Sequence, residues 1–247
     1  MNQLKGKVAV VTGASKGIGA GIAKAFGAEG ASVVVNYSSS KAGADAVVAA
    51  ITAAGGKAIA VQGDVSKASE AQGIIAAALK AYGRLDVLVN NSGVYEFGPV
   101  EAITEESFHR QFNINVLGLL LTTQAAMKHI GEGGSIINIS SAISRMKPPG
   151  SAIYTATKAS VDAISSVFAK EFGPKKVRVN ALNPGVTVTE GTHAAGVIGG
   201  DMEKGMVSQT PLGRVGQPDD IAKVAVFLAS DASAWVTGEV LNVSGGL

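Results

Sequence analysis

The first thirty residues constrain the fold more than any other part of the chain. A β-branched run at 7–12 leads into the turn Gly-Ala-Ser-Lys-Gly-Ile-Gly at 13–19, and an apolar helical pattern then continues to Gly30. Strand, glycine turn and helix in this order predict a unit that holds the phosphates of a nucleotide. The glycines permit a tight turn and a close approach of the backbone to a pyrophosphate, and the start of the helix offers free N–H groups.

Strand and helix patterns alternate along the rest of the chain. Seven strands separated by helices predict an α/β, single-domain, doubly wound Rossmann fold, with a seven-stranded parallel sheet covered on both faces. In such a fold the ligand binds beyond the carboxyl ends of the strands. No repeat or linker interrupts the pattern, so residues 1–247 are expected to form one dinucleotide-binding and catalytic domain. The expected strands are 7–12, 32–36, 57–62, 85–90, 135–140, 177–182 and 239–243, and the expected helices after the first are 41–54, 68–82, 104–127, 154–172 and 218–229.

Composition narrows the class of protein. The chain is 47% hydrophobic and 16% charged, which is ample material for a deep core. A net charge of +2 does not favour a nucleic-acid surface, and the absence of cysteine with only three scattered histidines does not favour a metal site or disulfides. Residues 1–7 lack the apolar core of a signal peptide and no apolar run approaches membrane length, so a cytoplasmic protein without a membrane partner is expected.

Three polar residues follow the strand at 135–140 and begin the next helix. Ser141 closes the strand, and Tyr154 and Lys158 are four residues apart, which places them on one helical face. An ammonium about 4.5 Å from a phenol, at an effective dielectric near 20, would lower the phenol pKa by roughly 2–3 units. The spacing therefore predicts a proton-transfer site, and the alternative is a half-buried tyrosine beside a surface lysine.

Together these motifs resemble the classical short-chain dehydrogenase/reductase family, closest to its bacterial 3-oxoacyl-carrier-protein reductase and glucose dehydrogenase branch. The resemblance spans essentially the whole chain, with the motifs in the family's order. The matching residues are Thr12-Gly-x3-Gly-x-Gly19, Asn90-Asn91-Ser92-Gly93, Asn115, Ser141, Tyr154-x3-Lys158 and Asn183-Pro184-Gly185.

The resemblance implies the catalytic roles. Tyr154 would be the general acid in reduction, and Lys158 would lower its pKa and hydrogen-bond the nicotinamide ribose. Ser141 would hold the carbonyl oxygen while hydride adds to the carbon. Asn115 would fix a water that links Lys158 to solvent, and Asn113 is a rival for that role by composition alone.

The resemblance also implies the contacts to the dinucleotide. Ser92 stands where the family commonly has alanine, Thr187 where it usually has an aliphatic residue, and Asp64 is alternatively a helix cap. Residues 187–210 would form the substrate lid. The implied contacts are Gly13, Ser15, Lys16, Gly17, Ile18 and Gly19 at the pyrophosphate and adenosine end, Asp64 and Val65 at the adenine, Asn91, Ser92 and Gly93 at the adenosine ribose, and Pro184, Gly185, Thr187 and Thr189 at the nicotinamide.

The end of the second strand bears on the choice between NADPH and NADH. NAD enzymes place an acidic residue there, whereas this chain reads Asn36-Tyr37-Ser38. The Asn36 amide and the Ser38 hydroxyl could donate to a 2′-phosphate, and Lys16 brings a positive charge. We therefore expect NADP(H) as the cofactor, with a polar turn and a solvated lysine as the alternative.

The function expected from these features is hydride transfer between NADPH and a carbonyl or secondary alcohol. The substrate would be a 3-oxoacyl thioester, a 3-oxoester or a simple ketone, and acyl carrier protein is a conceivable partner through Lys175 and Lys176. A glucose or polyol dehydrogenase, or a non-catalytic dinucleotide-binding regulator, remains the alternative. A homotetramer is expected from the family. It is also expected because the helices that carry residues such as Leu117 and Val167 have more apolar surface than one face of the sheet can bury.

Overall fold

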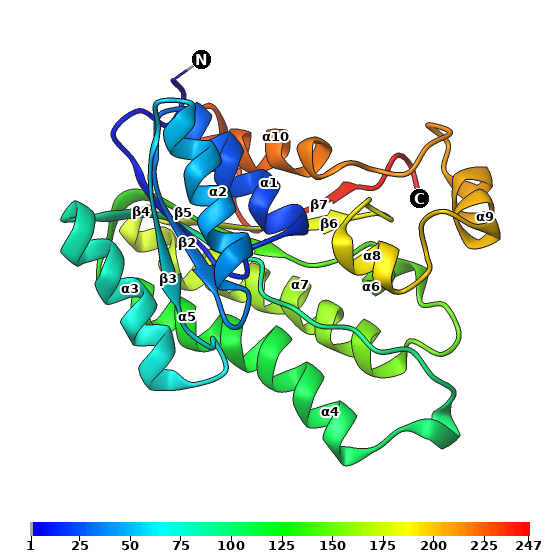
Figure 1. Ribbon diagram of the computed structural model, residues 1–247. Helices are drawn as coiled ribbons and strands as arrows, with labels where there is room; N and C mark the ends of the chain where they lie inside the picture. The colour runs from blue at the N-terminus through cyan, green and yellow to red at the C-terminus, as the bar shows by residue number, and fades with distance from the viewer. Residues whose placement is uncertain (1) are drawn as a thin grey trace.

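The computed structural model describes residues 2–247. Its centre is a seven-stranded sheet in the order β3-β2-β1-β4-β5-β6-β7, with every neighbouring pair parallel (Figure 1). This confirms the predicted doubly wound fold. The strands are β1 (Val8–Val11), β2 (Ser32–Tyr37), β3 (Lys57–Gln62), β4 (Leu85–Asn90), β5 (Ile130–Ile139), β6 (Arg178–Pro184) and β7 (Val240–Val243).

Helices cover both faces of the sheet, as the unbroken apolar run of β1 requires. Ala9 and Val11 pack into one core and Val8 and Val10 into the other, so each face of the strand is buried. The first core is closed by α1 (Gly17–Ala28), α2 (Lys41–Ala53) and α10 (Pro218–Ala229), and the second by α3 (Ala68–Tyr82), α5 (Gly118–Ala126) and α7 (Ala152–Phe172).

The helix expected at 104–127 is divided in the structure. It begins as α4 (Glu105–Phe112), widens into a π-helix at Asn113–Leu117, and continues as α5. Thr104 caps its start by accepting a hydrogen bond from the Ser107 N–H at 3.1 Å. A π-turn changes the hydrogen-bond register over a few residues only, so a 3.6-residue pattern read over the whole segment does not reveal it.

The segment predicted as a glycine-rich lid also contains short helices. These are α8 (Glu190–Ala194), capped by Thr189, and α9 (Asp201–Gln209), and both lie beyond the carboxyl ends of β6 and β7 (Figure 1). A further short helix, α6 (Ile143–Met146), follows β5. Among the described residues, no helix combines the length and apolarity needed to cross a bilayer.

Candidate active site

Ser141, Tyr154 and Lys158 meet at the carboxyl end of β5, as predicted. The Ser141 hydroxyl hydrogen-bonds the Tyr154 side chain, and the Lys158 ammonium lies 5.8 Å from the centre of the Tyr154 ring. Lys158 is 4% exposed and its Nζ donates to the Ile139 carbonyl at 2.8 Å. The strand end and one face of α7 therefore place a hydroxyl, a phenol and an amine in one pocket.

The electrostatics of this pair differ from the prediction. Burial raises the pKa of Tyr154 to about 12, although the hydrogen bond from Ser141 opposes the rise. Burial also lowers the pKa of Lys158 to about 8, opposed by the charge of Asp162. The predicted fall in the phenol pKa is therefore wrong for the protein alone: desolvation is the largest cause, and the Lys158 ammonium hydrogen-bonds the Ile139 carbonyl.

Asn115 lies in the π-helix and is 3% exposed, whereas its rival Asn113 is exposed. Its Oδ1 accepts from the Val94 N–H at 2.8 Å, and its Nδ2 donates to the Val94 carbonyl at 2.8 Å and to the Thr157 hydroxyl at 3.0 Å. The side chain thus ties α7 to the loop after β4. Both Nδ2 hydrogens are used, whereas Oδ1 accepts one bond and keeps a lone pair that can accept from a water.

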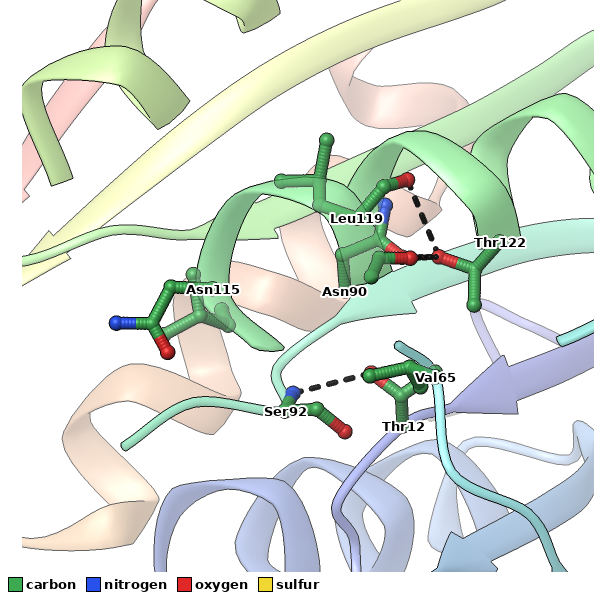
Figure 2. Close-up of a pocket in the computed structure, with 9 residues that line it drawn as sticks. Thr12, Val65, Asn90, Ser92, Asn115, Leu119 and Thr122 are labelled. Atoms are coloured by element: carbon green, nitrogen blue, oxygen red, sulfur yellow. Dashed lines mark hydrogen bonds between the residues drawn. The ribbon is translucent and has the colours of Figure 1, made fainter. Parts of the chain in front are cut away.

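A small cavity lies beside Asn115, at the carboxyl ends of β1 and β4 (Figure 2). Its volume of about 10 Å³ is close to the room that one water needs. Figure 2 shows the Thr122 hydroxyl directed at Asn90, with the bond to its Oδ1 at 2.5 Å, and the Ser92 N–H directed at Thr12, at 3.0 Å. These polar groups fix the end of β4, from which the Asn91-Ser92-Gly93 segment departs.

The glycine turn after β1 is braced by asparagines. Gly13 and Gly17 have φ of +60° and +58°, values that L side chains adopt only at a cost. The Asn91 amide donates to the carbonyls of Thr12 and Gly13 at 2.9 and 3.0 Å. A Cβ on Gly19 would lie 2.4 Å from the Asn91 Nδ2, so the turn has no room for a side chain there. The turn and the start of α1 fit a pyrophosphate.

Asn36 does not occupy the position expected of it. It is 1% exposed; its Oδ1 accepts from the Gly13 N–H at 3.1 Å and its Nδ2 donates to the Gly63 carbonyl at 3.0 Å. The amide therefore braces the glycine turn against the end of β3, and its predicted contact with a 2′-phosphate is wrong. Ser38 and Lys16 are exposed on the same edge and remain available.

A lid residue contacts the same glycine turn. The Glu190 carboxylate accepts a hydrogen bond from the Gly17 N–H at 2.9 Å, and a Cβ on Gly17 would lie 3.2 Å from the Thr189 methyl group. A carboxylate thus lies at the start of α1, where the turn presents its N–H groups to an anion.

The other predicted contacts border the same pocket. Asp64 accepts from the N–H and hydroxyl of Ser66 at 3.0 and 2.7 Å, which closes a turn ahead of α3, whose N-cap is Lys67. A Cβ on Gly93 would lie 3.6 Å from the Lys158 Nζ. Thr187 is 4% exposed and its hydroxyl donates to the Gly185 carbonyl at 3.0 Å, so this polar residue is satisfied within its own turn. Ser15, Ile18 and Val65 lie on the turn, on α1 and after β3, and Pro184 ends β6.

Two aromatic residues of the site were not predicted from the sequence. The Tyr95 ring lies 5.9 Å from the Tyr154 ring, and the Phe97 ring lies 5.9 Å from it, edge to face. Phe97 is 57% exposed, and a Cβ on Gly191 of α8 would lie 3.3 Å from the Tyr95 hydroxyl. The sequence offered one sign of them, because both follow β4 closely and the ligand is expected at the carboxyl ends of the strands.

Next to the Ser141 turn is a groove of about 950 Å³, which Arg145, Met146, Gly185 and Leu212 help to line. Lys175 and Lys176, in contrast, follow α7 at its far end. Seventeen residues of helix separate Lys158 from Lys175 at about 1.5 Å each, roughly 25 Å in all, and Lys176 pairs with Glu132 at 2.5 Å. These two candidate residues for contact with a carrier protein therefore lie at the end of α7 away from Lys158.

Comparison with known proteins gives a consistent result. Residues 13–247 match the family described as enoyl-(acyl carrier protein) reductase. An uncharacterised oxidoreductase of Methylorubrum extorquens is 66% identical over 247 residues, all of both chains. A hydroxynaphthalene reductase-like protein of Metarhizium robertsii is 40% identical, covering 98% of this chain and 95% of its own. A short-chain dehydrogenase from Burkholderia cenocepacia, solved in complex with NADP, has a TM-score of 0.93 at 34% identity, covering 99% and 98% of the two chains.

Proposed function

Because the chain belongs to the short-chain dehydrogenase/reductase family, we propose that it is an NADP-dependent oxidoreductase that reduces a ketone to a secondary alcohol. The observation that carries this proposal is the convergence of Ser141, Tyr154 and Lys158 beside the glycine turn. A protein that only bound the dinucleotide would need no phenol held between a hydroxyl and an ammonium. The presence of all three side chains therefore favours an enzyme over a regulator that only binds the dinucleotide.

The residues divide the chemistry between them. The Ser141 hydroxyl positions the carbonyl oxygen, and Tyr154 gives its phenolic proton to that oxygen as the alcohol forms. The buried Lys158 ammonium supplies the positive charge that stabilises the resulting phenolate, and the phenolate takes one proton back from solvent before the next turnover. The bound NADPH supplies the hydride that adds to the carbonyl carbon. A phenol whose pKa is about 12 holds its proton at neutral pH, which suits an acid in the reductive direction.

We place the cofactor on the glycine turn. Gly13, Gly17 and Gly19 would border its pyrophosphate at the start of α1, and residues Pro184–Thr189 would border its nicotinamide. Ser38 and Lys16 would contact the 2′-phosphate, since both are exposed at the edge next to β2. One charged hydrogen bond is worth about 1.5–3 kcal/mol, so NADPH should be preferred over NADH by about tenfold or more in kcat/KM.

The substrate that the pocket favours is a ketone on an apolar, preferably aromatic, framework. Tyr95 and Phe97 lie beside the Tyr154 ring, and aromatic pairs gain about 0.5–1.5 kcal/mol beyond their buried area. The relative from Metarhizium robertsii is named as a hydroxynaphthalene reductase-like protein, and hydroxynaphthalenes are aromatic. No basic patch adjoins the pocket at Lys175 and Lys176, so we favour a free ketone or 3-oxoester over a thioester carried by acyl carrier protein.

The test is the loss of NADPH absorbance in the near ultraviolet with a panel of substrates. The panel should include an aryl ketone, an aliphatic 3-oxoester, an acetoacetyl thioester and, in the oxidative direction, glucose. We expect the aryl ketone to give the highest kcat/KM. Tight NADPH binding with no turnover of any member would show that the protein is a binding module, and oxidation of glucose alone would assign it to the polyol dehydrogenases.

We further propose that the protein assembles into a homotetramer. Val167 on α7 and Leu117 in the π-helix are 51% and 41% exposed, and Ala163 is exposed on the same helix as Val167. Two adjacent helices thus leave apolar side chains uncovered, which is typical of a surface between subunits. Light scattering at micromolar concentration should give four times the monomer mass, and a monomer mass would contradict the proposal.

A further inference from the structure

Asp162 is an acidic residue of the active site with no role so far. It lies on α7 one helical turn after Lys158, and residues four apart share a helical face. Its side chain is directed at the turn after β5 and the end of β6, the two segments that carry Ser141 and Pro184. Asp162 therefore contacts the turn after β5 and the end of β6 from the helix that carries Tyr154 and Lys158.

Two hydrogen bonds join Asp162 to these segments. Its Oδ2 accepts from the Ser144 hydroxyl at 2.6 Å and from the Asn183 amide at 3.3 Å. The same Asn183 amide lies 3.1 Å from the Ser144 oxygen, so the three side chains form a closed triangle. Ser144 and Asn183 are 7% and 0% exposed.

The triangle reaches Ser141 through the backbone. The Ser144 N–H donates to the Ser141 carbonyl at 3.1 Å, and the Ala142 N–H donates to the Pro184 carbonyl at 2.9 Å. Asp162 thereby fixes the turn that aims the Ser141 hydroxyl at Tyr154. A displacement of about 1 Å in such a group can cost on the order of 100-fold in rate.

The second oxygen of the carboxylate has no such partner. Asp162 Oδ1 and Asn183 Oδ1 are both inaccessible to solvent and meet no hydrogen-bond donor among residues 2–247. A buried acceptor left unpaired costs about 1–3 kcal/mol, and more when it is charged. The site therefore holds two unpaired buried oxygens side by side, one from a carboxylate and one from an amide.

Asp162 and Lys158 lie four residues apart on α7, so they share one face of the helix. The ionisable groups whose charges act on the catalytic pair are Asp162, from the same helix, and Tyr95, from the loop after β4. Asp162 favours the ammonium form of Lys158, against the burial that disfavours it. Tyr95 is neutral near pH 7, because burial raises its pKa.

We propose that Asp162 is a positioning residue of the reductase site: its carboxylate fixes the Ser141 turn through Ser144 and places a negative charge on the helical face that carries Lys158. This rests on the proposed carbonyl reduction. In this arrangement the Asp162 carboxylate stabilises the Lys158 ammonium, and the ammonium stabilises the Tyr154 phenolate that forms during the reaction.

The first experiment separates the two effects with Asp162→Asn and Ser144→Ala. Asp162→Asn keeps the shape and removes the charge, so the pKa of Lys158 should fall and the basic limb of the kcat/KM profile for reduction should move to lower pH by about half a unit or more. Ser144→Ala removes the hydrogen bond and keeps the charge, so kcat should fall by about tenfold with the limb unmoved. The proposal would be overturned if the basic limb of the kcat/KM profile of Asp162→Asn stayed at its wild-type pH. It would also be overturned if Ser144→Ala had the wild-type kcat.

A second readout does not need turnover. In a double-mutant cycle of Asp162→Asn with Lys158→Met, followed by urea unfolding near pH 7, the effect of Asp162→Asn on the unfolding constant should differ at least about fivefold between the two backgrounds. Effects that agree within about twofold would mean that the two charges are independent and would refute the inference. If the wild type reduces no ketone but the cycle shows coupling, the proposed function fails while the pairing of Asp162 with Lys158 stands.

If Asp162→Asn does not fold, Asp162→Glu takes its place. The longer side chain keeps the charge and displaces the oxygen that Ser144 contacts. We expect a lower kcat with the basic limb at its wild-type pH, and a wild-type kcat would overturn the positioning role.

Discussion

Replacing Asn36 by aspartate tests whether this residue reads the cofactor or holds the fold. By its place in the sequence, an aspartate there should set a carboxylate against the 2′-phosphate and favour NADH. In the structure, the amide donates to the carbonyls of Gly63 and Val61 at 3.0 and 3.3 Å. A carboxylate would instead direct an oxygen at two carbonyl oxygens, in a side chain that is 1% exposed.

The cost can be worked from these contacts. Each buried acceptor left without its donor costs about 1–3 kcal/mol, so the loss of two donors gives about 2–6 kcal/mol before the burial of the charge is counted. The surviving bond, from the Gly13 N–H at 3.1 Å, offsets part of this. We therefore expect Asn36→Asp to lower the free energy of unfolding by at least about 2 kcal/mol, measured by urea unfolding at a fixed protein concentration.

Ser38→Asp is the matched control. Ser38 is exposed one residue beyond the end of β2, so its carboxylate would lie in solvent next to the expected 2′-phosphate. It should shift the ratio of kcat/KM toward NADH with stability unchanged within about 0.5 kcal/mol. If Asn36→Asp were as stable as the wild type and inverted the cofactor preference, the structural role of this amide would be refuted.

Three further changes probe the site. Tyr154→Phe should lower kcat by about 10²–10⁴ while NADPH still binds, as checked by steady-state kinetics and cofactor fluorescence, and a variant with a tenth of the wild-type kcat would contradict its role as the acid. Because the pKa of Lys158 is lowered from 10.5 to about 8, the unfolded chain binds more protons between these values, so stability contributed by this residue is lost as pH falls from 10.5 toward 8. The stability of the wild type relative to Lys158→Met should therefore rise between pH 8 and pH 10 in urea unfolding, and a flat difference would contradict the burial of the amine. Glu190→Gln removes a charge from the start of α1, so the Kd of NADPH should fall about two- to fivefold, measured by calorimetry, whereas a weaker affinity would mean that the carboxylate assists binding.

Much of this architecture could be predicted from the chain. The turn at 13–19 and the alternation of strands and helices are local patterns, and they gave β3, β4, α3 and α10 with the bounds that the structure has. Ser141, Tyr154 and Lys158 could be brought together because strand ends share one edge and a spacing of four shares one helical face.

The parts that could not be predicted depend on contacts between distant residues. The direction of the Asn36 amide depends on Gly13 and Gly63, which lie 23 and 27 residues away. The pKa of Tyr154 depends on burial, which no spacing reveals, and desolvation reversed the expected direction. The triangle around Asp162 joins residues 18 and 21 positions apart, so an aspartate on a helix gave no local sign of its role.

The central place of β1 in the sheet has a consequence for how the chain folds during synthesis. β1 leaves the ribosome first, but one of its edges is filled only by β4, and Val8 and its partner Asp86 are 78 residues apart. At roughly 5–20 residues per second, that edge stays open for about 4–16 s. During this time β1, β2 and β3 can pair with one another, while the apolar strand Val8–Val11 presents unpaired backbone groups. Protection of this edge until Leu85–Asn90 emerges is therefore a requirement that nascent chains of this topology must meet.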